Sequence, residues 1–449
     1  MATNKNDLNS YENLVFGLGE TGMSIARYFN RKKINAIYID TRREPPNLSE
    51  IKEYDPNAKF FFGDIPLDIL DNVRRIIVSP GLVLDHPILN KAVELGINIV
   101  SDIDLFIESS QAEVIAITGS NGKSTVTTLL GLMCNHSGKK VLTGANLGCP
   151  ALDLLAQDQP EYYILELSSF HLHKTKYLPT RVSVVLNLSA DHLDWHNTEK
   201  HYFEAKYRVY SNAKMAVYNR TLPDSFNYFH ENIPSLSFGS EIPEAGHYGI
   251  LIRDGSKFLV KGEDALIKTS EIGLVGDHNY LNALAALAIG DMIGLDQSSM
   301  LDALRKFTGL PHRMQLVGNF NSVDYINDSK GTNVGAVIAS VQSMAGPVIL
   351  IAGGQGKGAN FKYLAESIHK EIRSIIIFGQ DAPLIAKEFE NLVTLYLAND
   401  LKQAVIKARD IAIKGDSVLL SPACASFDQF DNYMHRGDVF SSVVKTLMT

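Results

Sequence analysis

The clearest chemical pattern in the sequence is a short polar run that follows the strand-like segment Val114–Ile117. The run consists of Gly119, Ser120, Asn121, Gly122, Lys123, Ser124 and Thr125. Glycines in such a loop let backbone N–H groups and the start of the next helix, predicted over Thr125–Cys134, face phosphate oxygens. Lys123 would contact the β- and γ-phosphates, and Ser124 would contact Mg²⁺. The run predicts an ATP site, with a purely structural strand-to-helix turn as the alternative.

A second glycine pattern, Gly17-Leu18-Gly19-Glu20-Thr21-Gly22, follows the first strand-like run, and Asp40 ends the next one. This spacing is typical of a dinucleotide-binding loop whose acidic residue contacts a ribose. Taken alone, the pattern indicates an NAD enzyme. A uridine diphosphate group fits equally well, because any anionic nucleotide group on that helix N-terminus needs the same glycines. A structural tight turn is the third interpretation.

Two further side chains follow strand-like runs and are candidates for a metal site. Glu166 is near the end of one apolar run, and His192 follows the run Val182–Leu188. Because α/β proteins place ligand groups at the carboxyl ends of parallel strands, we expect both to bind Mg²⁺ beside the phosphate loop. A surface acid and a loop histidine are the alternatives. Lys206, in a predicted helix over His201–Tyr210, is typical of a surface lysine whose stem lies along neighbouring aromatic side chains.

Three polar loops with small residues follow strand-like runs in the last part of the chain, at residues 327–333, 353–358 and 421–428. If these strands are parallel, their carboxyl ends meet at one edge of a sheet, which predicts one binding edge. Lys330 and Lys357 would hold carboxylate or phosphate oxygens there. Solvated surface charge is the alternative for each lysine.

Short apolar β-branched runs alternate with helical patterns along the chain, which predicts parallel sheets covered by helices on both faces. The length of 449 residues exceeds what one hydrophobic core usually serves and favours about three domains. We therefore predict an α/β fold with three domains, each built on a largely parallel sheet with flanking helices. The outer two are Rossmann-like and the central one is a P-loop-type ATPase domain, and the predicted bounds are 1–101, 102–309 and 310–449.

Composition and charge exclude several classes of protein. A formal net charge of -8 removes the broad positive field that would attract nucleic acid or an anionic membrane surface. The N-terminus is polar, and no run of about 18 apolar residues occurs, so we expect neither export nor membrane insertion. Cys134, Cys149 and Cys424 are far apart and lack metal-ligand spacing, which fits a reducing compartment. We expect a cytoplasmic protein.

Taken together, these residues resemble the Mur ligases, which use ATP to join amino acids to nucleotide-linked cell-wall precursors. The family shares a Thr-Gly-Ser/Thr-Asn-Gly-Lys-Ser/Thr loop, which accounts for Ile117 at the place where commoner phosphate loops have glycine. The resemblance extends over all three predicted domains in order. The other matching segments are Gly17–Gly22, Asp40–Arg42, Ser79–Gly81, Glu166–Phe170, Asp328–Lys330 and Ser421–Phe430.

The resemblance implies a set of site residues. For the nucleotide-linked precursor these are Gly19, Glu20, Thr21, Asp40, Thr41, Arg42, Ser79, Pro80, Gly81 and Asn146. ATP would be bound by Gly119–Thr125 with Asn279, Arg313 and Asp328, and Mg²⁺ by Ser124, Glu166, His192 and a carbamylated Lys206. Lys123, His192 and Lys206 would be catalytic. The amino acid would be held by Lys330, Thr332, Lys357, Ser426, Phe427 and Tyr433.

Within the family, the resemblance implies addition of D-glutamate to UDP-N-acetylmuramoyl-L-alanine through an acyl phosphate, in peptidoglycan precursor synthesis. We expect a monomer. Three residues depart from the family pattern. Glu20 replaces a small or apolar residue, His171 replaces glutamine and Gln355 replaces aspartate. Glu20 puts a negative charge near the expected diphosphate site, so the departures concern contacts with the substrates and not the type of reaction.

Other functions remain open at this point. The first glycine pattern with Asp40 favours a dehydrogenase, which absorbance of a nicotinamide would reveal. A non-catalytic nucleotide switch would use the phosphate loop, but it leaves the polar edge of the last domain without a role. A sister ligase for another amino acid, or a folylpolyglutamate synthase, differs from the first interpretation only in substrate.

Overall fold

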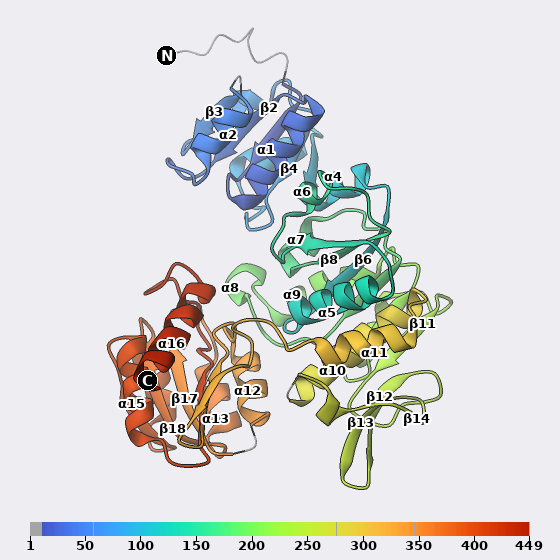
Figure 1. The fold of residues 1–449 in the computed structure, drawn as a ribbon. Coiled ribbons are helices and arrows are strands. Elements are labelled where there is room, and N and C mark those ends of the chain that lie inside the picture. The colour runs from blue at the N-terminus through green and yellow to red at the C-terminus, as the bar shows by residue number, and fades with distance from the viewer. Residues whose placement is uncertain (1–10, 57, 275, 345, 449) are drawn as a thin grey trace.

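The computed structural model describes residues 11–448 except residues 57, 275 and 345. It contains three sheets, each flanked by helices, which follow one another along the chain (Figure 1). The predicted fold class of three largely parallel α/β domains is confirmed. The domain bounds at 101/102 and 309/310 stay predictions. The start of the first domain within residues 1–10, the polar N-terminus discussed above and the last residue, Thr449, lie outside the described part.

The first sheet is entirely parallel and has the order β3-β2-β1-β4-β5. Its strands are β1 (Asn13–Phe16), β2 (Ala36–Asp40), β3 (Lys59–Phe62), β4 (Arg75–Val78) and β5 (Asn98–Ser101). Its helices are α1 (Glu20–Lys32), α2 (Leu48–Tyr54) and α3 (Pro87–Glu94). The chain changes direction of winding between β1 and β4, so the loops after these strands are neighbours. This is where open α/β sheets bind ligands.

The central sheet has the order β14-β13-β12-β11-β10-β9-β6-β8-β7. Its parallel strands are β6 (Glu113–Thr118), β7 (Val141–Ala145), β8 (Tyr162–Glu166), β9 (Val182–Val185), β10 (Ala216–Asn219) and β11 (Ser235–Phe238). β12 (Tyr248–Arg253) pairs parallel with β11 and antiparallel with β13 (Ser256–Lys261), which pairs antiparallel with β14 (Asp264–Lys268). The helices are α4 (Asp102–Ser109), α5 (Lys123–His136), α6 (Ala151–Leu154), α7 (Ser169–Lys174), α8 (Leu193–His196), α9 (Glu199–Tyr207), α10 (Asp277–Met292) and α11 (Gln297–Lys306).

The third sheet has the order β15-β16-β20-β17-β18-β19. Its strands are β15 (Gln315–Phe320), β16 (Val323–Asn327), β17 (Val348–Gly353), β18 (Ile372–Phe378), β19 (Thr394–Leu397) and β20 (Ser417–Leu420). All pair parallel except β15, which is antiparallel to β16. The helices are α12 (Val334–Gln342), α13 (Phe361–Ile368), α14 (Ala382–Phe389), α15 (Leu401–Ile411) and α16 (Tyr433–Met448).

Buried apolar side chains explain why these elements pack as layers. Between Asn279 and Gly290, α10 is buried at nearly every position, and it packs against α5 over the central sheet. A helix that is apolar on most sides fits only such an enclosed place. No helix in the described part of the chain is both long and apolar enough to cross a membrane.

Several predicted elements differ in extent from those observed. The run Val182–Leu188 was expected to be a strand, but β9 ends at Val185, and Asn187 instead bonds to the phosphate loop. The helix predicted over Thr125–Cys134 begins at Lys123. The helix predicted over His201–Tyr210 is α9 followed by a 3₁₀ turn at Arg208–Tyr210.

Candidate active site

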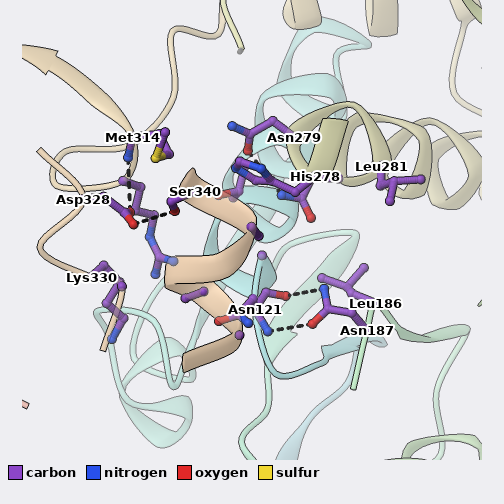
Figure 2. Close-up of a pocket in the computed structure, with 18 of the residues that line it drawn as sticks. Asn121, Leu186, Asn187, His278, Asn279, Leu281, Met314, Asp328, Lys330 and Ser340 are labelled. Carbon is purple, nitrogen blue, oxygen red and sulfur yellow. Dashed lines mark hydrogen bonds between the residues drawn. The ribbon is translucent and has the colours of Figure 1, made fainter. Parts of the chain in front are cut away.

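The phosphate loop, residues 119–122, connects β6 to α5, as its sequence predicts. Gly122 precedes the first residue of α5 and has φ +80°, a conformation that favours glycine. A Cβ atom there would lie 2.2 Å from Asn282 Oδ1 of α10. Asn121 exchanges hydrogen bonds with Asn187, its N–H donating to the Asn187 side chain at 2.8 Å (Figure 2). The close approach of α10 and the Asn187 contact fix the loop in front of the N-terminus of α5.

Lys123 bends back over this loop. Its Nζ donates to the carbonyl oxygens of Gly119 and Ser120, both at 2.8 Å. Burial lowers the pKa of Lys123, opposed by the nearby Glu166 carboxylate. The lysine therefore lies where the loop would present a cation to phosphate oxygens.

Ser124, Glu166 and Arg313 form a chain of hydrogen bonds beside the loop. Ser124 Oγ donates to Glu166 Oε2 at 2.6 Å, and Arg313 Nη2 donates to Ser124 Oγ at 2.7 Å. Asn146 Nδ2 donates to the other carboxylate oxygen of Glu166, also at 2.6 Å. Burial acts to raise the pKa of Glu166, but Lys123 and these hydrogen bonds outweigh it, so the pKa is lowered. Glu166 is therefore a buried carboxylate that stays ionised.

Lys206 is buried, with 2% of its surface exposed, so its interpretation as a surface lysine is wrong. It projects from α9 toward the phosphate loop, and its Nζ donates to Gly119 O at 2.8 Å. The ring of Tyr202 on the same helix lies 4.7 Å from Nζ, and the Tyr202 hydroxyl is 3.1 Å from Ser120 Oγ. Burial, with Lys123 nearby, holds the pKa of Lys206 well below its usual value. The local sequence does not indicate this burial, because the face of α9 that carries Lys206 and Tyr202 contacts the phosphate loop, which is distant in sequence.

His192 lies at the start of α8 with φ 53°, next to Asp191, and its ring is 4.8 Å from that of Phe170. Its side chain is exposed at the edge of the site. Among the described residues, no group of three or more His, Cys, Asp or Glu side chains is arranged as a metal site. The predicted Mg²⁺ set relies on the Ser124 hydroxyl and on modification of Lys206 as well as on Glu166 and His192.

A cavity of about 290 Å³ lies between the phosphate loop, α10 and α12, where loops and helices that flank the central and third sheets face one another (Figure 2). It brings together predicted nucleotide residues from distant parts of the chain, namely Asn121, Gly122, Thr125, Asn279, Arg313 and Asp328. His278 and Ser340 also line it, although neither belongs to a motif that is recognisable in the sequence. Asn187 also lines the cavity. It follows the end of β9, the place where parallel strands carry ligand groups, although the apolar run Val182–Leu188 indicates a strand at this position.

Asp328 is a buried carboxylate at this cavity. It accepts hydrogen bonds from Ser340 Oγ and Ser421 Oγ, each at 2.8 Å, and from the Met314 N–H at 3.3 Å (Figure 2). Burial raises its pKa to about 6 in spite of these donors. Asp328 thereby connects the cavity to the third predicted loop of the last domain.

The structure brings the three polar loops of the last domain to one edge, as expected from parallel strands. The Ala423 N–H donates to Gly331 O at 2.8 Å, and the Gly353 N–H donates to Pro422 O at 2.9 Å. Arg436 of α16, whose burial no local sequence pattern indicates, is fully buried beneath this edge and donates to Ser329 O at 2.8 Å and Cys424 O at 3.1 Å.

Only part of the predicted amino-acid site faces the cavity. Lys330 lines it, lies 4.1 Å from the Tyr433 ring, and has a pKa lowered to about 8 by burial and by Arg313 and Lys123. Lys357 is exposed, and its Nζ is 5.4 Å from the ring of the exposed Phe427. Of the described residues lining the cavity, none is Thr332, Lys357, Ser426, Phe427 or Tyr433.

The predicted precursor residues gather at the carboxyl edge of the first sheet. Asp40 accepts a hydrogen bond from the Leu18 N–H at 2.7 Å and is 2.7 Å from Arg42 Nη2. Ser79 Oγ donates to Gly17 O at 2.8 Å and so joins the loops after β1 and β4. Gly19 precedes α1, where Glu20 and Thr21 begin the helix. Thr41 and Gly81 are exposed and Pro80 is partly buried.

Domain models for one family match most of the chain. Residues 11–101 match the Mur ligase MurD-like N-terminal domain, 117–290 the Mur ligase middle domain, and 312–424 the Mur ligase glutamate ligase domain.

Curated relatives match over nearly their whole length. The UDP-N-acetylmuramoylalanine–D-glutamate ligase of Legionella pneumophila (strain Paris) is 43% identical over 444 residues, which cover 97% of this chain and 99% of the relative. The ligase of the same name from Pseudomonas aeruginosa is 43% identical over 438 residues, covering 97% of this chain and 98% of that protein.

Solved structures share the fold at low sequence identity. MurF from Acinetobacter baumannii has a TM-score of 0.63 at 16% identity, with 99% of this chain and 97% of that chain covered. The UDP-N-acetylmuramate–alanine ligase MurC from Thermotoga maritima has a TM-score of 0.60 at 17% identity, with coverages of 97% and 99%. With three domain matches in order and full-length relatives at 43% identity, the chain belongs to the Mur ligase family.

Proposed function

We propose that this protein uses ATP to join D-glutamate to UDP-N-acetylmuramoyl-L-alanine in peptidoglycan precursor synthesis. The observation that carries the proposal is the 43% identity, along 97% of the chain, to curated ligases named for this reaction. The phosphate loop supports it independently, because the loop lies beside the buried carboxylate Glu166 and opens on a cavity between the central and third sheets.

ATP binds in that cavity, with its phosphates on residues 119–125, which form the phosphate loop and the N-terminus of α5. Asn279, Arg313 and Asp328 line the cavity and complete the nucleotide site. Lys123 and Arg313 supply positive charge on two sides of the phosphates. Their contribution is electrostatic, since charge built up in a phosphoryl transfer is stabilised by fixed cations.

Mg²⁺ would be held by Ser124, Glu166, His192 and Lys206 in carbamylated form. The oxygen donors of this set fit, because Mg²⁺ prefers oxygen ligands and the Ser124 and Glu166 oxygens are 2.6 Å apart at the phosphate loop. When bound, the ion would neutralise charge on the phosphate oxygens. Only a neutral amine reacts with carbon dioxide to form a carbamate, and the lowered pKa of Lys206 favours that neutral form.

The reaction has two steps. The alanine carboxylate of the precursor attacks the γ-phosphorus of ATP, which forms an acyl phosphate and releases ADP. The amine of D-glutamate then attacks the acyl carbon, phosphate leaves with the bonding electron pair, and the new amide loses a proton. Neither step needs a nucleophile from the protein, so the protein acts by holding the reactants together and by stabilising charge.

The precursor lies with its UDP group at the carboxyl edge of the first sheet, near Gly19–Thr21, Asp40–Arg42 and Ser79–Gly81, and Asn146 contacts it beside Glu166. Its acyl end reaches toward the phosphate loop. D-Glutamate is held at the edge of the third sheet by Lys330, Thr332, Lys357, Ser426, Phe427 and Tyr433. Lys330 is at the junction of the amino-acid and nucleotide sites, because it lines the cavity.

The protein acts as a monomer in the cytoplasm, with domains at residues 1–101, 102–309 and 310–449. The alternation of apolar runs with helical patterns along the sequence supports the domain bounds.

Phosphate release from ATP tests the function. The assay contains UDP-N-acetylmuramoyl-L-alanine and compares D-glutamate with L-glutamate, L-lysine, meso-diaminopimelate and no amino acid. Release that depends on D-glutamate is expected. Release with another amino acid only would move the protein to a sister specificity, and no release would contradict the ligase assignment.

A further inference from the structure

Lys174, the last residue of α7, is a buried lysine for which the proposed reaction has no role. Its Nζ donates to three backbone carbonyls of one loop of the first sheet, to Ser79 O at 2.8 Å, to Pro80 O at 2.5 Å and to Leu82 O. An ammonium group has three N–H donors, so all of them are used. The Lys174 side chain thus binds the backbone of the loop that follows β4.

The backbone around Lys174 is itself anchored. Thr175 Oγ1 lies 3.2 Å from Ser101 Oγ, and the Lys176 N–H donates to Asp104 Oδ1 at 2.8 Å. Ser101 and Asp104 form the capping box of α4, so they are fixed by hydrogen bonds of their own. Because α7 begins shortly after Glu166, one short segment reaches from the phosphate site to the loop of the first sheet.

Because peptide groups are planar, the contact with Lys174 also determines where the N–H groups on the other side of the loop point. In a trans peptide the C=O group and the N–H group of the next residue point in opposite directions. The carbonyls of Pro80 and Leu82 point to Lys174, so the N–H groups of Gly81 and Val83 point away from it. Both residues are exposed, and no described residue accepts a hydrogen bond from either N–H.

We propose that Lys174 is a positioning residue for the nucleotide-linked substrate, which sets the loop 79–82 so that the Gly81 and Val83 N–H groups face an anionic group of that substrate. The inference rests on the proposed function, which places the precursor at this loop. Backbone N–H groups arranged side by side are a common way to bind anions.

The protonation state of Lys174 gives a second readout. Burial lowers its pKa to about 7, and Asp102 of α4 opposes the shift. His171 and His173 of α7 also act on it electrostatically, and the ring of Trp195 lies 5.5 Å from Nζ. A neutral amine has two N–H donors, so one carbonyl contact is lost above this pH. The KM for the precursor should therefore rise between about pH 7 and pH 9.

The test compares Lys174→Met with Lys176→Met in steady-state kinetics. Lys176 is a matched control, because its exposed side chain crosses the same boundary and donates to Asn98 Oδ1 at 2.8 Å without contacting the loop. Lys174→Met should raise the KM for the precursor about 10- to 100-fold, the range expected for charged hydrogen bonds. The kcat and the KM values for ATP and D-glutamate should stay within about twofold, and Lys176→Met should match the wild type.

An unchanged precursor KM in Lys174→Met, or an equal rise in all three KM values, would overturn the inference. Circular dichroism together with the melting temperature checks that the variant is folded. If Lys174→Met does not fold, the pH dependence of the wild type still tests the inference. A KM for the precursor that does not change from pH 6 to pH 9 contradicts it. A wild type without D-glutamate-dependent turnover would instead refute the proposed function.

Discussion

Arg313, which precedes the third sheet, donates a hydrogen bond of 2.7 Å to Ser124, the second residue of the helix after the phosphate loop. The same Ser124 hydroxyl donates to Glu166 at the end of β8. The contact between residues 189 positions apart joins the third domain to the proposed ATP site. The arrangement of the domains and the chemistry of the site are therefore coupled at one hydroxyl group.

Replacing Lys123 by alanine should lower kcat by about 10³-fold or more, because fixed charge at a transferred phosphate has effects of that size. The fold should persist, since Lys123 contacts only the carbonyls of its own loop through Nζ. Phosphate release and circular dichroism provide the measurement. Lys140→Ala, which removes an exposed lysine paired with Asp158, is the control with unchanged turnover. Full activity of Lys123→Ala would refute the assignment of the loop.

Replacing Lys206 by alanine should abolish turnover, and short carboxylic acids added to the assay should restore part of it by supplying the missing anion. Lys214→Ala serves as the matched control, because Lys214 is an exposed lysine paired with Glu113. Loss of activity without any recovery, over a wide range of acid concentrations, would argue against a carbamate at this position.

Much of the fold follows from local patterns in the sequence. The short, largely apolar runs Arg75–Val78 and Ser417–Leu420 are strands in the structure, as is typical of parallel strands buried on both faces. The short strand β3 was not predicted, since all four of its residues are only partly buried and its pattern is weak.

The burial of charged side chains at the site could not be predicted from the sequence, because it depends on tertiary contacts. Lys206, Lys174 and Arg436 have the residue types of a surface, yet all three are buried because each donates to backbone carbonyls of another segment. Partners so distant in sequence leave no local periodicity. The glycines between β6 and α5 are recognisable in the sequence, because the turn that they form depends on neighbours in the chain.

Asp328 should make stability fall with rising pH. Its folded-state pKa of about 6 is above the unfolded value of 3.8, so the folded protein binds more protons between these values. This contribution is fully present below about pH 4 and is lost as the pH rises through 6. It corresponds to about 3 kcal/mol. Chemical unfolding of the wild type and of Asp328→Asn from pH 4 to pH 7 measures it, and parallel curves for the two proteins would contradict the prediction.

Replacing Gly122 by alanine should disturb the phosphate loop. The new methyl group would meet Asn282 Oδ1 at 2.2 Å, and the residue would be held at positive φ. We expect a loss of about 1–3 kcal/mol in unfolding free energy and a raised KM for ATP. Gly138→Ala is the comparison, because Gly138 also has positive φ but has no atom near its added Cβ. Equal effects on the KM for ATP would show that the contact with α10 is unimportant.

Oxygen transfer from the precursor to phosphate shows whether the reaction passes through an acyl phosphate. The protein is incubated with ATP, D-glutamate and UDP-N-acetylmuramoyl-L-alanine whose alanine carboxylate carries ¹⁸O at both positions, and mass spectrometry follows phosphate and product. We expect phosphate with one ¹⁸O and an amide product that keeps the other, both formed only when D-glutamate is present. Unlabelled phosphate, or the same labelled phosphate without D-glutamate, would contradict it.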